Sequence, residues 1–76
     1  MQTYRTTDLY IASYLKTVGR QLVDADNKNG RITFIFDNDD DAIKALVIAY
    51  TNKEGKVEPC IFVDNIKNMK SLTHNL

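Results

Sequence analysis

Four of the five residues in segment 37–41 are aspartates, which makes this segment the clearest candidate for metal chemistry in the sequence. A calcium-binding EF-hand loop needs oxygen ligands at positions 1, 3 and 5, a glycine at position 6 and a glutamate at position 12. Counted from Asp37, positions 6 and 12 are Ala42 and Ile48. We therefore expect no calcium site, and we interpret the aspartates as residues that end a strand and cap the following helix.

The single cysteine, Cys60, is the only candidate nucleophile with a favourable position. It follows Pro59 at the expected start of a helix, where the helix N-terminus and the nearby Lys56 favour a reactive thiolate. A nucleophilic cysteine also needs a base, and the only histidine, His74, lies in a C-terminal segment that we expect to fray. We therefore expect Cys60 to pack as a small hydrophobic residue.

Tyrosines and cations gather in the N-terminal part of the sequence. Such side chains can stack bases and bind phosphates, can form the centre of a protein interface, or can pack at the edge of a core. A formal net charge of zero disfavours nucleic acid, because nucleic-acid-binding modules usually carry an excess of basic residues. The N-terminal tyrosines and cations, together with Ile35 of a predicted strand, form our candidate interaction surface. Its residues are Tyr4, Arg5, Tyr10, Tyr14, Lys16, Arg20 and Ile35.

The composition is that of a small globular domain. The chain has 76 residues, 43% of them hydrophobic and 26% charged, so we expect one domain over 1–76 with an ordered core at about 6–71. One cysteine excludes an internal disulfide, and no apolar run reaches the roughly 20 residues of a membrane span, which together favour a cytoplasmic protein. The sequence has no glycine-rich phosphate loop, metal-ligand spacing or catalytic triad, so we expect no enzyme activity, metal or cofactor.

A β-hairpin is expected in the middle of the chain. Residues 31–36 alternate between two faces, one of which carries Phe34 and Phe36, and residues 21–25 have a weaker strand pattern. The Asn-Gly pair between these strands tolerates the positive φ angles that a tight hairpin turn requires.

Three helices complete the expected fold, at residues 7–18, 40–52 and from Pro59 to about Ser71. Thr6 or Thr7 is the expected cap of the first, and the second is apolar on nearly two faces, so we expect it to be the central helix. The sequence thus predicts a small α+β domain of order α-β-β-α-α, an antiparallel hairpin covered by helices. The helix residues expected in the core are Ile11, Leu15, Leu46, Tyr50, Phe62, Ile66 and Met69.

The predicted strand 31–36 has few features that prevent it from pairing with another chain. It has no proline, its only charge is Arg31, and Ile35 makes its second face partly apolar. Residues 2–5 could cover it as a third strand, or two copies could pair edge to edge. We favour the homodimer, with Ile35 near the contact.

Three stretches of the sequence stand out: Tyr4–Leu15 with the following Gly19, then Gly30–Asp37, then Phe62–Leu72. Their order and spacing resemble a family of short bacterial and phage domains of unknown function. The resemblance implies a bacterial or phage origin and an intracellular accessory role, and it brings no catalytic residue. Thr73 departs from the family's pattern, in which an aliphatic residue is expected at the end of the last helix.

Taken together, the sequence predicts a non-enzymatic protein-binding accessory or regulatory domain, such as a phage-encoded modulator of a host complex. The alternative is a module that binds single-stranded nucleic acid through the N-terminal tyrosines and cations, namely Arg5, Tyr10, Tyr14, Lys16 and Arg20.

Overall fold

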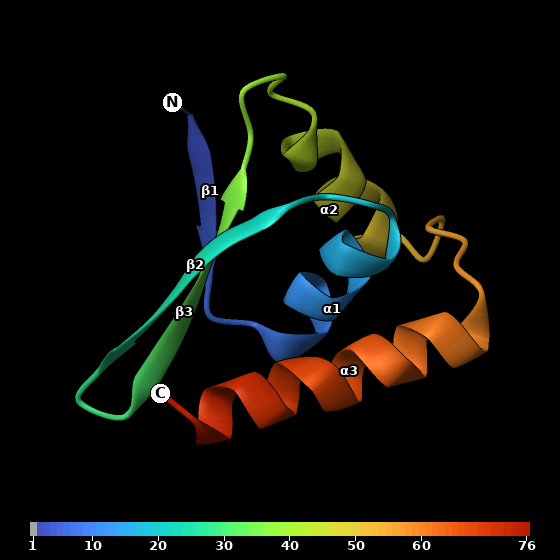
Figure 1. The fold of residues 1–76 in the computed structure, drawn as a ribbon. Coiled ribbons are helices and arrows are strands. Elements are labelled where there is room, and N and C mark those ends of the chain that lie inside the picture. Colours follow the sequence, from blue (N-terminus) through green and yellow to red (C-terminus); the bar gives the residue numbers. More distant parts are fainter. Residues whose placement is uncertain (1) are drawn as a thin grey trace.

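The computed structural model describes residues 2–76, which form three strands and three helices (Figure 1). From the first helix onward the order is α-β-β-α-α, as predicted, and one further strand precedes it. The elements are β1 (Thr3–Thr6), α1 (Leu9–Thr17), β2 (Leu22–Lys28), β3 (Arg31–Asp37), α2 (Ile43–Thr51) and α3 (Pro59–His74).

β3 is the middle strand of an antiparallel sheet whose order is β1-β3-β2. The turn between β2 and β3 contains Asn29 and Gly30, with φ angles of 55° and 84°. Both angles are positive, as expected of the Asn-Gly pair in a hairpin turn. The turn is shorter than expected, because β2 continues to Lys28 instead of ending at residue 25. The register of β2 against β3 shifts between Leu22 and Asp24, which makes Val23 the extra residue of a β-bulge.

The strand β1 covers the edge of β3 that the predicted hairpin left open. We expected this edge to be covered either by residues 2–5 as a third strand or by a second copy of the chain. The structure has the third strand, which spans Thr3–Thr6 and pairs with β3. The predicted dimer contact through β3 is therefore wrong, because both edges of this strand are paired within one chain. Self-association through another surface stays a prediction.

Ile35, which we expected near a dimer contact, is a buried residue in the centre of the sheet. In the register of the sheet it lies between Arg5 of β1 and Asp24 of β2. These neighbours on both sides leave only 8% of Ile35 exposed.

The core lies between the sheet and the helices. Phe34 and Phe36 are 2% and 0% exposed, which confirms that their face of the sheet is the buried one. Of the predicted helix residues, Leu15 and Met69 are fully buried in this cluster. Four others are partly buried against it: Ile11, Leu46, Tyr50 and Phe62. The seventh, Ile66, is half-buried but is not among the residues that pack against the cluster.

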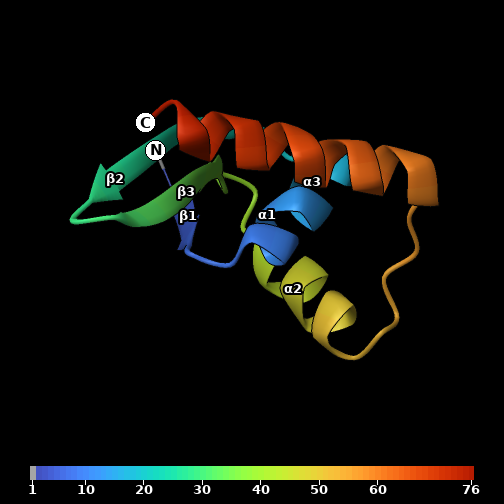
Figure 2. The same cartoon turned by 90° about the horizontal axis from the view of Figure 1, so that it is seen from below.

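The central helix is α1, and not α2 as the sequence suggested. Figure 2 shows α1 between α2 and α3. Ala12 and Ser13 of α1 are both 0% exposed, and such small side chains allow neighbouring helices to approach closely. The second apolar face of α2 faces outward instead, where Ile48 is 51% exposed.

Side chains next to the helices fix where each helix begins. Asp8 caps α1, in place of the expected threonines, and its Oδ1 accepts hydrogen bonds from the backbone N–H groups of Tyr10 and Ile11 at 2.8 and 3.0 Å. At α2, the Oδ1 of Asn38 accepts from the N–H of Ile43 at 3.1 Å. The helix therefore begins at Ile43, three residues later than predicted.

The last helix is longer than predicted. We expected α3 to fray after Ser71, but it continues to His74. The hydroxyl of Thr73 donates to the carbonyl of Lys70 at 2.6 Å, and the Asn75 amide donates to the carbonyl of Ser71 at 3.1 Å. These two side-chain hydrogen bonds lie in the last turn of the helix and in its C-cap.

Candidate functional site

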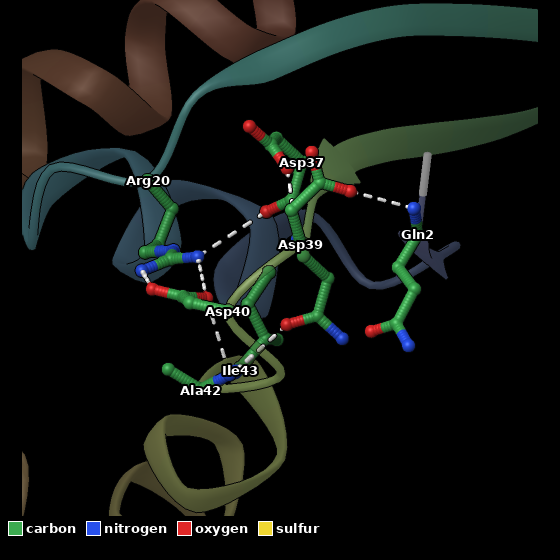
Figure 3. A network of polar contacts seen from close by, with 8 residues as sticks. Gln2, Arg20, Asp37, Asp39, Asp40, Ala42 and Ile43 are labelled. Atoms are coloured by element: carbon green, nitrogen blue, oxygen red, sulfur yellow. Dashed lines mark hydrogen bonds and ion pairs between the residues drawn. The ribbon is translucent and has the colours of Figure 1, made fainter.

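The aspartate-rich segment 37–41 connects β3 to α2 and is tied to the rest of the fold by a network of hydrogen bonds (Figure 3). Arg20 forms a two-pronged ion pair with Asp40, at 2.9 Å from Nη1 to Oδ2 and 2.6 Å from Nη2 to Oδ1. The Oδ1 of Asp39 accepts a hydrogen bond from the backbone N–H of Gln2 at 2.7 Å. The segment thus fastens the end of β3 to the residues that follow α1 and precede β1.

These contacts agree with the expected structural role of the aspartates only in part. Asp37 ends β3 as expected, but no aspartate caps α2: its N-cap residue is Ala42, without a side-chain capping hydrogen bond, and the N–H of Ile43 is bonded by Asn38. Asp37 accepts from the N–H of Asp39 at 2.9 Å, and Asp40 accepts from the N–H of Ala42 at 3.2 Å, so two carboxylates stabilise the turn before α2. Within residues 2–76, no three histidine, cysteine, aspartate or glutamate side chains come together as possible ligands of one metal ion.

Two carboxylates carry shifted pKa values. The hydrogen bond from Arg20 holds the pKa of Asp40 below its ordinary value, and in return the hydrogen bond to Asp40 raises the pKa of Arg20. The carboxylate of Glu58, which caps α3, accepts from the N–H of Ile61 at 2.7 Å, and this bond lowers the pKa of Glu58. Both shifts mean that the folded protein favours the ionised carboxylate over the protonated acid.

We expect the protein to lose stability in acid through these two groups. A carboxylate whose pKa is lower in the folded protein than in the unfolded chain stabilises the fold at pH values above its unfolded pKa, which is 3.8 for Asp40 and 4.5 for Glu58. This stabilisation is lost as the pH falls through the folded pKa. Melting temperatures measured by circular dichroism from neutral pH to pH 2 should fall below about pH 4.5. Asp40→Asn and Glu58→Gln should each flatten that fall, whereas Asp64→Asn, at an exposed position of α3, should not. The same acid sensitivity in all three variants would contradict this assignment.

The N-terminal tyrosines of the candidate surface do not lie together on it. Tyr10 is 51% exposed and Tyr4 is half-buried, whereas Tyr14 is only 4% exposed. The ring of Tyr14 packs against Tyr50 of α2, with 5.0 Å between ring centroids. Burial of Tyr50, together with the charge of Asp8, raises the pKa of its hydroxyl. Tyr14 is therefore part of the contact between α1 and α2, and only Tyr10 presents a largely free ring.

The three predicted cations also lie apart. Arg5 is exposed on the sheet beside Ile35, and Lys16 is exposed on α1. Arg20 is held by Asp40 and by the carbonyl of Asp37 at 3.4 Å. The structure therefore does not gather the predicted residues into one patch, and it removes Tyr14, Arg20 and Ile35 from the free surface.

Cys60 is exposed, which corrects the expectation that it is a packed hydrophobic residue. Our interpretation failed because Phe62 and Met69 form the inner face of α3 and leave Cys60 on the outside. Cys60 borders a shallow hollow of about 250 Å³ with Pro59, Val63 and Asp64.

One hollow lies where three segments that are distant in the sequence meet, and we call it the hairpin groove. It has a volume of about 680 Å³ and lies beside the β2–β3 turn, the start of α1 and the end of α3. Apolar residues from α1 and β3 contribute to its lining, and polar residues come from the turn and the helix ends. The lining residues are Thr7, Leu9, Asn29, Gly30, Arg31, Ile32, Phe34 and Thr73.

The hairpin groove was not predicted from the sequence, although one residue gave a signal. Thr73 is polar at a position of α3 where the family resemblance led us to expect an aliphatic residue, and it lines this groove. An aliphatic side chain here would make the lining more apolar. The other lining residues come together only through the tertiary fold.

The chain belongs to the family of the domain of unknown function DUF5659, whose family model matches residues 1–75. No curated protein and no solved structure matches the sequence. Among residues 2–76, none of the helices has the length and apolar character that crossing a bilayer would require.

Proposed function

We propose that this member of the DUF5659 family is a non-enzymatic protein-binding accessory or regulatory domain that holds its partner in the hairpin groove. The observation that carries the proposal is the lining of the groove, which combines the partly exposed apolar residues Leu9 and Ile32 with polar Thr7 and Thr73. Protein contacts combine apolar with polar groups, as this lining does. A partner side chain that is large and apolar fits this lining.

The charges beside the groove indicate the chemistry of the partner. Lys28 and Arg31 face each other across the end of the hairpin. Two like charges in direct cross-strand register repel each other. Within residues 2–76 the ion pair of Arg20 with Asp40 is the only one, so neither hairpin cation has a carboxylate partner there. We infer that the partner presents an acidic group beside its apolar side chain.

The proposal includes the setting that the sequence suggested. The protein acts in the cytoplasm of a bacterium, as a bacterial or phage product that modulates a host complex. Its support is the order and spacing of the stretches Tyr4–Leu15, Gly30–Asp37 and Phe62–Leu72. The proposal also includes a homodimer, whose contact must lie away from β3.

Charge reversal at the groove tests the proposed contact. Tagged wild-type protein should capture its partner from cells of the source organism, and Arg31→Glu should lose at least about ten-fold of that binding, as expected when a charged contact worth about 1.4 kcal/mol is lost. The matched control is Lys67→Glu, an equal charge change at an exposed position of α3 that is not part of the groove lining, and it should bind as wild type does. Equal capture by both variants would overturn the groove assignment.

The nucleic-acid alternative is tested in the same samples. The residues that support it are Tyr10, Arg5 and Lys16, which remain exposed. If it holds, a labelled single-stranded oligonucleotide should bind wild-type protein at low salt and dissociate steeply as salt is added. We expect no binding at low salt, because Tyr14 is buried and Arg20 is paired with Asp40.

A further inference from the structure

The two outer edges of the sheet differ in how well they can pair with another strand. On β2 the bulge at Val23 and the charged residues Asp24, Asp26 and Lys28 interrupt the edge. Bulges and charges are the usual devices that prevent edge pairing. On β1 the sequence Thr-Tyr-Arg-Thr has no bulge, no proline and a single charge, and its register against β3 is continuous. The edge of β1 is therefore open to a further strand.

The register of β1 shows which backbone groups lie on its free edge. The N–H of Asn38 donates to the carbonyl of Gln2 at 3.0 Å, so Gln2 and Asn38 form a hydrogen-bonded pair in the antiparallel ladder. Hydrogen-bonded pairs alternate with non-hydrogen-bonded pairs along an antiparallel ladder. The next hydrogen-bonded pair is therefore Tyr4 with Phe36, and the pairs of Thr3 with Asp37 and of Arg5 with Ile35 are not hydrogen-bonded. The backbone N–H and C=O groups of Thr3 and Arg5 therefore point away from β3. No residue in the range 2–76 uses them in a hydrogen bond outside the sheet.

We propose that two copies of this chain pair antiparallel along β1, around a two-fold axis at Tyr4, to form one six-stranded sheet. The inference deepens the self-association in the proposed function and names its surface. In this register Thr3 of each copy faces Arg5 of the other, and the outward groups of these residues form four hydrogen bonds. The arrangement is self-complementary because Thr3 and Arg5 lie symmetrically on either side of Tyr4.

The side chains of β1 suit a second copy. Tyr4 is half-buried on the helix side of the sheet, where it packs against the core. Tyr4 of one copy would face Tyr4 of the other in a non-hydrogen-bonded pair, the closest kind of cross-strand pair, and the two rings would cover each other. On the opposite face Arg5 would lie next to Thr3 of the second copy, with Asp37 of that copy on the following strand. Arg5 has no ion pair within residues 2–76, so the charges are complementary.

A proline on the free edge tests the proposed dimer. Thr3→Pro removes an N–H that points away from β3, so it should leave the fold intact and prevent edge pairing. Sedimentation of wild-type protein from low micromolar to near-millimolar concentration should show the mass rise from 8.7 kDa towards twice that value. Thr3→Pro should stay at one chain throughout, whereas the control Lys56→Pro, in the loop between α2 and α3, should dimerise as wild type does.

A second measurement uses the unaltered chain. The amide hydrogens of Thr3 and Arg5 should exchange quickly in dilute samples and at least ten-fold more slowly where the mass has doubled. A single-chain mass at every concentration would overturn the proposal, as would a dimer that Thr3→Pro leaves intact or one with unprotected amides. None of these results would contradict the proposed binding of a partner in the hairpin groove, because no residue of β1 lines that groove.

Discussion

Replacing Phe34 by alanine should leave the protein unfolded at 25 °C or lower its melting temperature by at least about 12 °C. Phe34 is 2% exposed and lies on the central strand, between Thr6 of β1 and Ala25 of β2. Truncation of a buried phenylalanine costs about 3–5 kcal/mol, and each kcal/mol lowers the melting temperature of a domain of this size by roughly 4–8 °C. A chain of 76 residues has a total stability of only about 4–11 kcal/mol.

The matched control for Phe34→Ala is Thr33→Ala, which changes the neighbouring residue on the other face of the same strand. Thr33 is half-buried, so its replacement should change the free energy of unfolding by less than about 1 kcal/mol. Urea unfolding followed by circular dichroism measures both variants. A cooperative transition of Phe34→Ala close to that of wild type would show that Phe34 is not part of the core.

Gly55→Ala should also destabilise the fold, by about 1–3 kcal/mol. A Cβ atom at this position would lie 2.7 Å from the hydroxyl oxygen of Tyr14 and 2.8 Å from its Cε1. The ring of Tyr14 is buried between α1 and α2 and cannot move aside freely. Where a new methyl group has space, the same substitution usually stabilises by about 0.4–1 kcal/mol, because alanine restricts the unfolded chain. The crowding by Tyr14 therefore decides the sign of the effect.

A double-mutant cycle isolates that contact. In the background of Tyr14→Leu, which removes the crowding ring, Gly55→Ala should become neutral or stabilising. Lys56→Ala, at the exposed neighbouring position, should change the melting temperature little in either background. A melting temperature of Gly55→Ala equal to or above that of wild type would mean that the loop before α3 yields to the added methyl group without cost.

Features that depend on neighbouring residues were predictable from the sequence. The hairpin follows from Asn29-Gly30 and from the alternation in β3, and the start of α3 follows from Pro59. The buried face of β3 was also correct, since Phe34 and Phe36 share one side of the strand. In each case a few adjacent residues determine the backbone conformation.

Features that depend on distant partners were predicted poorly. The sequence of β1 has no strong strand signal, because its stability comes from pairing with β3, with Thr3 opposite Asp37. The central place of α1 depends on the small Ala12 and Ser13, whose low hydrophobicity made the more apolar α2 appear to be the inner helix. Local patterns could not settle either question.

The candidate site was less predictable than the fold. Tyr14 and Arg20 looked available for binding because their partners, Tyr50 and Asp40, lie far along the chain. The hairpin groove brings together residues from Thr7 to Thr73, so no linear motif describes it. A binding surface that is assembled in this way becomes visible only once the chain has folded.

The position of β1 also affects how the chain folds during synthesis. The ribosome makes Thr3–Thr6 before β3, whose residues pair with them and follow roughly thirty residues later, with Thr3 opposite Asp37. β1 therefore stays unpaired and exposed until the β2–β3 hairpin has left the exit tunnel. Its pairing with β3 then closes a long loop of the chain. With two threonines, one tyrosine and one arginine, β1 exposes little apolar surface during that interval, which lowers its tendency to pair with other chains.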